Sequence, residues 1–230
     1  MAVAVDVAGS QATSASGTSY SYTGITVGAS ATALLVVVAI AASSAPGNAI
    51  CHWDTAGTNV AMLRVGTQTG GGSACNLGLY GLINPAPGNK TLGITWTASG
   101  VACVCAISFT GTAVVSNSAT FINFASSNVT GASQNLNVTS TWFPNSAIAG
   151  AGICSNDTFP VANGFAWYQA THFSGTNSSN GQYIFPSSSP GSLGWTMAGG
   201  TIAVALAGLE IVPAPAPTGP TDQGMVVCEW

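Results

Sequence analysis

Short apolar segments recur along the whole chain, and glycine, proline, serine and asparagine separate them. In residues 92–96 and 103–109 the side chains alternate, so every second residue lies on one face of a pleated strand. Residues 32–42 are apolar at nearly every position, which predicts a strand buried on both faces. No segment shows the 3.6-residue period of a helix between capping residues. The pattern predicts an all-β fold with under about a tenth of its residues in helix.

Ten strands are predicted between turn signals such as Pro46-Gly47-Asn48 and Ser99-Gly100. They cover residues 18–27, 32–42, 49–54, 59–66, 75–83, 90–97, 101–109, 134–142, 165–173 and 201–212. Many short strands at this spacing favour one antiparallel β-sandwich. Residues 174–190 are predicted to form a polar loop that holds at most one short strand.

The predicted organisation has one domain between two extended arms. Residues 1–17 are expected to form an N-terminal arm, residues 18–212 the sandwich domain, and residues 213–230 a linker and tail. A chain of 230 residues is the usual length of a single large sandwich.

The C-terminal segment combines a stiff linker with an apolar tail. Four prolines between positions 213 and 220 favour an extended backbone. Beyond them, Met225, Val227 and Trp230 are predicted to be assembly contacts. Cys228 lies among these residues, and it could reach a thiol of a neighbouring subunit or pair within its own chain.

Charged residues are very scarce in this chain. Two are basic and six are acidic, so eight side chains in all carry a full charge, and the net charge is −4. An ordinary domain is about a quarter charged. Two basic residues cannot neutralise a run of phosphates, so neither nucleic acid nor an anionic membrane is an expected partner. A surface of neutral polar residues suits an assembly subunit better than a soluble metabolic enzyme.

One apolar segment needs to be weighed as a membrane segment. Residues 31–46 contain about a dozen strongly apolar positions, whereas a spanning helix needs about 20. The segment also lacks the basic flank of a secretory signal. A buried strand is therefore the better interpretation.

The six cysteines carry no zinc signature, because no Cys-X-X-Cys pair is present. They are Cys51, Cys75, Cys103, Cys105, Cys154 and Cys228. At least one disulfide is expected, formed late after release from a cell, and the alternative is a set of buried thiols that pack as small hydrophobes. Cys103 and Cys105 share one face of a strand, so they are not expected to bridge each other.

Residues 51–54 bring three reactive side chain types close together. On a strand, Cys51 and Trp53 face one side, while His52 and Asp54 face the other. A His–Asp pair could orient a base or bind a metal. No nucleophile stands beside it and His172 is distant in the sequence, so an exposed strand face is favoured. We expect no enzymatic activity, no cofactor and no metal.

Aromatic residues offer a further possibility, because exposed rings beside polar loops can bind sugars. Trp167-Tyr168 and Trp195 are candidates for such a carbohydrate site. Tryptophans in a sandwich more often belong to the core, which is the alternative interpretation for all three positions.

A family resemblance rests on segments that follow one another in order. They are Ala-Leu-Leu-Val-Val at 33–37, Cys-His-Trp-Asp at 51–54, Leu-Tyr-Gly-Leu-Ile-Asn-Pro-Ala-Pro-Gly at 79–88, Leu-Gly-Ile-Thr-Trp at 92–96 and Ala-Ile-Ser-Phe-Thr-Gly at 106–111. With residues 195–197 and 202–211 as closing strands, residues 18–212 resemble the jelly-roll sandwich modules of bacteriophage virion proteins and some bacterial surface proteins. The resemblance implies a jelly-roll fold without a catalytic signature. The cysteines are not part of that pattern.

These observations favour a structural virion protein, namely a capsid decoration (cement) protein on the outside of a phage head. A head or tail fibre component and a carbohydrate-binding adhesin module are the alternatives. A hydrolase that uses His52 and Asp54 is the least favoured. The expected partners are further copies of the chain, as a homotrimer, and the major capsid protein or other virion proteins. The expected location is the virion surface, after assembly in the cytoplasm of the bacterial host.

Overall fold

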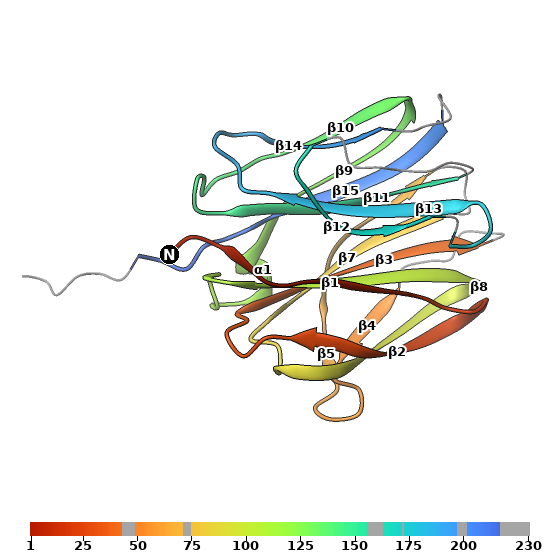
Figure 1. The fold of residues 1–230 in the computed structure, drawn as a ribbon, viewed down its shortest axis with the longest axis horizontal. Coiled ribbons are helices and arrows are strands. Elements are labelled where there is room, and N and C mark those ends of the chain that lie inside the picture. The colour runs from red at the N-terminus through yellow and green to blue at the C-terminus, as the bar shows by residue number, and fades with distance from the viewer. Residues whose placement is uncertain (43–48, 71–74, 156–162, 172, 197–201, 217–230) are drawn as a thin grey trace, which may run out of the picture.

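The computed structural model describes residues 1–42, 49–70, 75–155, 163–171, 173–196 and 202–216. Within these ranges it contains fifteen strands and one four-residue helix, α1 (Asn117–Thr120). Every strand pair is antiparallel. The all-β prediction is therefore confirmed. The strands form three sheets that lie in successive layers (Figure 1).

The first sheet is built entirely from the first half of the chain. Its strands are β1 (Ala4–Thr13), β2 (Gly17–Val27), β3 (Ala33–Ala42), β4 (Ile50–Trp53), β5 (Val60–Ala61), β6 (Leu63–Gly70), β7 (Cys75–Ile83) and β8 (Gly88–Thr110). The hydrogen-bonded order is β5-β4-β8-β3-β7-β6. Strands β4 and β3 pair with successive parts of one edge of the long strand β8, and β2 and β1 pair with its other edge. The sheet curls into a nearly closed, barrel-like shape.

Strand β8 is a single strand of 23 residues, so the turn predicted at Ser99-Gly100 is wrong. Gly100 instead pairs with Ala42 of β3 and with Gly17 of β2. A Cβ atom at Gly100 would lie 2.4 Å from the carbonyl oxygen of Ala41. The glycine therefore permits a close approach of two backbones, which the sequence pattern cannot distinguish from a turn.

The second half of the chain forms the other two layers. A five-stranded sheet has the order β12 (Phe165–Ala170), β13 (Asn177–Ile184), β11 (Ala147–Ser155), β15 (Ile202–Ile211), β9 (Phe121–Gly131). Outside it lies a two-stranded sheet of β10 (Ser133–Val138) and β14 (Gly191–Thr196). The predicted sandwich is thus extended by a layer.

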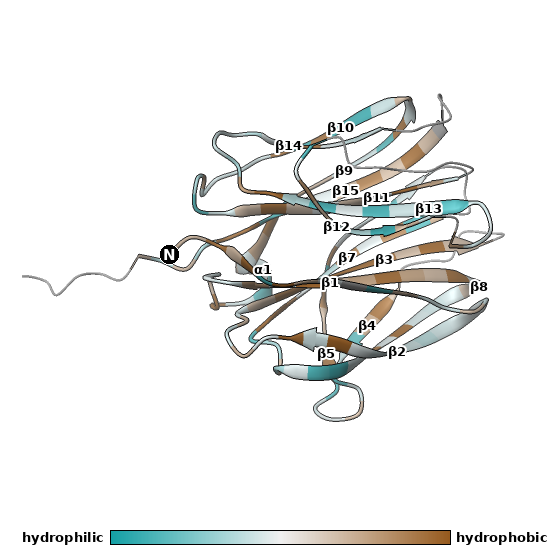
Figure 2. Ribbon diagram, in the orientation of Figure 1, coloured by the Kyte–Doolittle hydropathy of each residue, from teal (hydrophilic) through white to brown (hydrophobic). Residues whose placement is uncertain are grey.

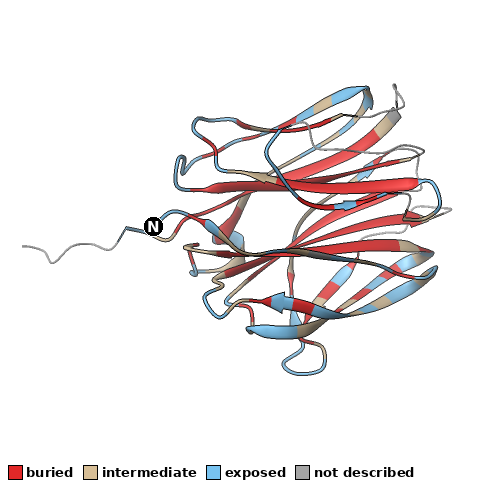
Figure 3. Cartoon of the chain, in the orientation of Figure 1, coloured by how far each residue is buried: buried red, intermediate tan, exposed pale blue. Residues whose placement is uncertain are grey.

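Three hydrophobic clusters fill the spaces around these sheets. The inner cluster lies inside the curled first sheet and includes Trp53 and Leu92. The central cluster joins the first sheet to the five-stranded sheet and includes Phe109 and Leu209. The outer cluster, around Trp195, lies under the two-stranded sheet. Buried residues accordingly follow the middle layers, and exposed ones lie at the loops and outer strands (Figure 3).

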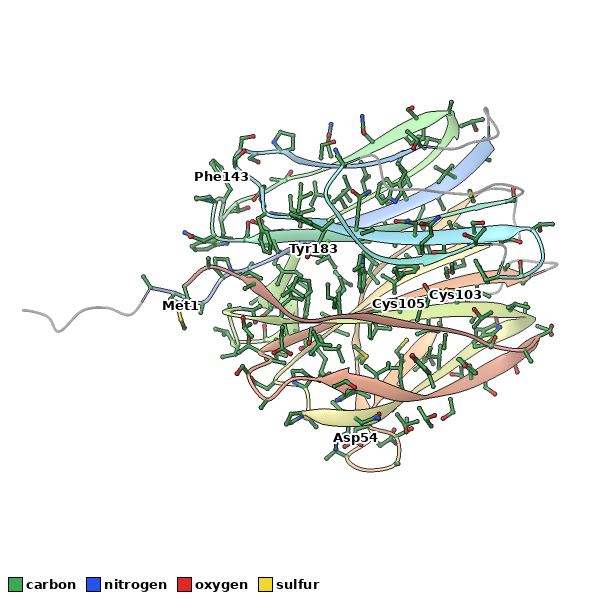
Figure 4. All side chains as sticks on the ribbon, viewed as in Figure 1. Met1, Asp54, Cys103, Cys105, Phe143 and Tyr183 are labelled. Carbon is green, nitrogen blue, oxygen red and sulfur yellow. The ribbon has the colours of Figure 1, made fainter. Side chains whose placement is uncertain are left out.

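Two of the predicted patterns are confirmed by these clusters. Strand β3 is buried on both faces, because Leu35 and Val37 belong to the central cluster while Val36 belongs to the inner one. In β8, Cys103 and Cys105 share the face toward the central cluster, as the alternation predicted (Figure 4).

The termini of the predicted domain differ from the expectation. Residues 4–13, expected in an arm, form β1, and its register runs from Ala4 opposite Thr110 to Thr13 opposite Cys103. At the other end, Pro213 forms a bridge with Thr112, so the first linker residues pack on the body.

Strand β13 is the main surprise, because it lies in the predicted polar loop and yet is mostly buried. Figure 2 shows hydrophilic segments along it. The Gln182 side chain donates to the Gly194 carbonyl at 2.7 Å. Ser179 donates to the Gly152 carbonyl at 2.8 Å, so the Tyr168 hydroxyl, 2.7 Å away, is the donor to Ser179. These hydrogen bonds offset part of the cost of burying a polar strand, although both polar atoms of the buried Asn180 amide have no hydrogen-bond partner among the described residues.

Glu210 of β15 is a fully buried carboxylate that ties this sheet to the turn after β10. The backbone amides of Thr141 and Trp142 donate to it at 2.8 and 2.9 Å. The Ser140 hydroxyl and the Asn123 amide add contacts of 3.0 and 2.8 Å. Neutral donors alone therefore hold this anion in place among the described residues.

The same contacts determine the protonation state of Glu210. Burial raises the pKa of the carboxyl, but the hydrogen bonds from the Thr141 and Trp142 amides and from Ser146 and Ser140 outweigh it. The net pKa lies below its ordinary value. The folded protein therefore favours the ionised form of Glu210.

Stability contributed by Glu210 should consequently be lost in acid. It is present above the unfolded-state pKa of about 4.3 and is lost as the pH falls through the lower folded-state pKa. Glu210→Gln should lower the free energy of unfolding at pH 7 by about 2–3 kcal/mol. The variant should also lose less stability than wild type between about pH 5 and pH 3. Urea unfolding at several pH values measures both effects, and identical acid dependence of the two proteins would contradict the role assigned to Glu210.

Candidate functional site

The His52–Asp54 pair, which the sequence left as a less favoured alternative to an exposed strand face, is not formed. Cys51 and Trp53 belong to the inner cluster, as expected, and His52 points outward, where its Nδ1 lies 3.1 Å from Oδ1 of Asn59. Asp54 has a φ of 54° and turns into the loop that follows β4. The two side chains therefore have different partners, and the proposed orientation of a base by Asp54 has no geometric support.

Asp54 organises its own loop instead (Figure 4). Its Oδ2 accepts hydrogen bonds from the amide and the hydroxyl of Thr58, both at 3.2 Å, and lies 3.4 Å from Nζ of Lys90. The Thr58 amide, together with Lys90, lowers the pKa of Asp54. Among the described residues, no three His, Cys, Asp or Glu side chains gather as a metal site would require. His172 lies outside the described residues.

A shallow groove opens beside His52, where β2, β4 and β8 meet. Its volume is about 490 Å³. The lining residues are Ser19, Tyr20, Ser21, Ile50, His52, Thr55, Asn59, Gly93, Ile94 and Thr95. We call it the Tyr20 groove. It offers an exposed Ile50 beside hydroxyl, amide and imidazole groups, which is the composition of a small-ligand site.

The ring of Tyr20 is held in place by its neighbours on β2. Tyr20 and Tyr22 stack with ring centroids 6.4 Å apart and an interplanar angle of 7°. Both rings also pack on the inner cluster, and the Tyr22 hydroxyl donates to the Gln11 carbonyl at 3.3 Å. Both rings therefore lie on the inner-cluster face of β2, whereas Ser19 and Ser21 lie on its exposed face.

The aromatic residues predicted as sugar-binding candidates lie elsewhere. Trp167 and Tyr168 are 6% exposed and belong to the central cluster, while Trp195 is fully buried in the outer cluster. The core interpretation is therefore correct for all three. Sequence reasoning missed Tyr20 because nothing in its local sequence distinguishes it from a core tyrosine.

A second candidate surface lies at the end of the molecule where the N-terminus and the last described residues meet (Figure 1). This hollow has a volume of about 440 Å³. It is lined by Met1, Ala113, Val115, Ala119, Trp142, Asn145, Val212, Pro213, Ala214, Pro215 and Ala216. We call it the end patch. None of these side chains is charged, and Met1, Val115 and Trp142 are 69%, 81% and 51% exposed.

Backbone hydrogen bonds fix the walls of the end patch. The Met1 amine donates to the Ala214 carbonyl at 3.1 Å, and the Ala214 amide donates to Gly111 at 2.7 Å. The Trp142 amide donates to Glu210, so the ring is anchored on the same turn as that carboxylate. The predicted assembly contacts in the tail, namely Met225, Val227 and Trp230, lie outside the described residues.

The expected disulfide is not found among the five described cysteines, all of which carry thiols in buried positions. Burial raises the pKa values of four of these five thiols. The pKa of Cys103 rises to about 12, those of Cys51 and Cys105 rise well above the ordinary value, and that of Cys75 is also raised. The interpretation as small packed hydrophobes is thus the one that the structure supports. Cys228 lies outside the described residues.

In comparisons with known proteins, no family model, no curated protein and no solved structure matches this chain. Within the described residues, no helix is long and apolar enough to cross a membrane.

Native thiol labelling should separate Cys228 from the other cysteines. Iodoacetamide reacts with the exposed thiolate, so the five buried cysteines should stay unmodified in the folded protein at neutral pH. Mass spectrometry should show at most one adduct for wild type and none for Cys228→Ser. In denaturant, Cys228→Ser should gain five adducts. Labelling of the folded variant, or fewer adducts after unfolding, would contradict the assignment of buried thiols.

Proposed function

We propose that this chain is a structural subunit on the outside of a bacteriophage virion, a decoration protein of the head built on a jelly-roll-like module. Its partners are further copies of the chain, arranged as a trimer, and the major capsid protein. A head or tail fibre component would use the same surfaces. The sequence resemblance described above supports the family of virion modules.

The observation that carries this proposal is the contrast between a nearly uncharged shell and one apolar end. Among the described residues, Arg64 is the only exposed charged side chain. Asp54 and Glu210 are buried, and Asp6 accepts hydrogen bonds from Gly28 and Ser108 at 2.9 and 2.7 Å. These three carboxylates thus accept hydrogen bonds from the protein itself, while the end patch offers apolar area for assembly.

Attachment to the particle should survive high salt. Screening acts on charges, and this surface has too few of them for an ionic interface. Washing purified particles with about 1 M NaCl should leave the chain bound, and cryo-electron microscopy should place it outside the shell. Absence of the chain from particles, or its release by that wash, would overturn the proposal.

The Tyr20 groove favours carbohydrate binding as a second candidate function. The exposed Ile50 side chain can pack on the apolar face of a sugar, while His52, Asn59 and Thr55 offer hydrogen-bonding groups beside it. Such a site would suit an adhesin module or a particle that contacts a glycan-bearing surface.

A glycan array with wild-type protein tests this candidate. Ile50→Ala should weaken binding of any recognised glycan by about tenfold, because the exposed apolar wall of the groove is lost. Phe165→Ala is the control, since Phe165 is also apolar and exposed but lies on the five-stranded sheet. Lack of any binder at millimolar sugar, or equal effects of the two variants, would remove the carbohydrate site.

A further inference from the structure

We propose that the end patch binds the apolar tail, residues 225–230, of a neighbouring copy of this chain. The proposal concerns how copies of the chain associate, and it does not require that they lie on a virion.

The end patch has the composition of a protein interface, because its exposed side chains are apolar. Val115 and Met1 are the most exposed of the large apolar side chains described, and Trp142 is the one described tryptophan with substantial exposure. Tryptophan and methionine are enriched where proteins meet. No side chain of the patch is charged, and the one charge there, the Met1 amine, donates to the Ala214 carbonyl at 3.1 Å.

The walls of the patch are already in position before any partner binds. Val212 accepts a hydrogen bond from the Ala113 amide at 2.9 Å, and Asn145 accepts one from the Val3 amide at 2.8 Å. Together with the bonds of Ala214, they connect the N-terminus, the segment after β8 and the segment after β15. A preformed surface loses little conformational freedom on binding, which favours association.

The tail has a matching composition. Residues 225–230 have the sequence Met-Val-Val-Cys-Glu-Trp, with four large apolar side chains and one charge. They begin nine positions after Ala216, which itself lines the patch. Nine residues span at most about 30 Å, so the tail begins within reach of a neighbouring molecule.

The linker favours a neighbour over the same chain. Prolines recur between positions 213 and 220, a composition that favours an extended backbone over one that folds back onto the patch. To return, the chain would have to reverse within residues 219–224 and cover its own residues 213–216. A tail of one copy on the patch of the next is a heterologous contact, which closes into a ring such as a trimer or continues as a filament.

The geometry also bears on Cys228, which was expected either to bridge subunits or to pair within its chain. No cysteine lines the end patch, so docking of the tail there offers Cys228 no thiol partner. Association through this contact is therefore non-covalent and should not depend on reductant.

The test compares oligomeric state by analytical ultracentrifugation of the full-length chain and its variants. Wild type should form an oligomer, unchanged by reductant, whereas deletion of residues 225–230 should weaken association at least tenfold. Val115→Ala and Trp142→Ala should also weaken association. Val115→Ala is the variant less able to disturb folding, because the Val115 side chain is 81% exposed. Phe165→Ala, at an exposed aromatic residue that does not line the patch, should associate like wild type.

A mixing experiment distinguishes the neighbour from the same chain. A tail-deleted chain keeps only an acceptor patch, and a Val115→Asp chain keeps only a donor tail. Each should be monomeric alone, and together they should form a 1:1 complex. An oligomer that survives deletion of the tail would overturn the proposal. A monomeric wild type whose Trp142 becomes more solvent-accessible when its own tail is deleted would also overturn it, in favour of a tail bound to its own chain.

Discussion

The rest of the molecule depends on the shared pairing of β8. This one strand carries β3 and β4 along one edge and β1 and β2 along the other. It can do so because it is long enough to serve two partners in succession on each edge. Its second half is apolar on both faces, so it contributes to the inner and central clusters at once. The curl of the first sheet, and the flat contact with the second, follow from that double burial.

Neutral polar groups perform most of the tasks that charges perform in other proteins. Hydroxyl and amide side chains such as Ser179 and Gln182 provide hydrogen bonds in the buried strand β13, and the described carboxylates accept hydrogen bonds from backbone amides of turns. The result is a shell with little electrostatic field around it. Such a shell resists ionic association, so contacts with partners must come from shape and apolar area. The end patch is where the described surface provides them.

The sequence allowed the strands with strong patterns to be predicted. β3 is wholly apolar and both halves of β8 alternate, and burial on the expected faces confirms these patterns, although the two halves were predicted as separate strands. β11 was missed because its residues are small. β13 was expected only as one short strand in a polar loop, because Asn180 and Gln182 resemble loop residues when their partners are unknown. The Tyr20 groove could not be predicted either, because three strands distant in the sequence build it.

The division of the chain into two halves has a consequence for its synthesis on the ribosome. The first sheet is complete once Thr110 has been made, so its inner cluster can form early. β9 ends at Gly131, but its ladder partner β15 begins only at Ile202 and occupies an interior place in its sheet. Until β15 emerges, the nascent chain carries a complete first sheet, and the five-stranded sheet that covers its central-cluster face is still unfinished. Chaperones that shield apolar surfaces would have their longest opportunity during this interval.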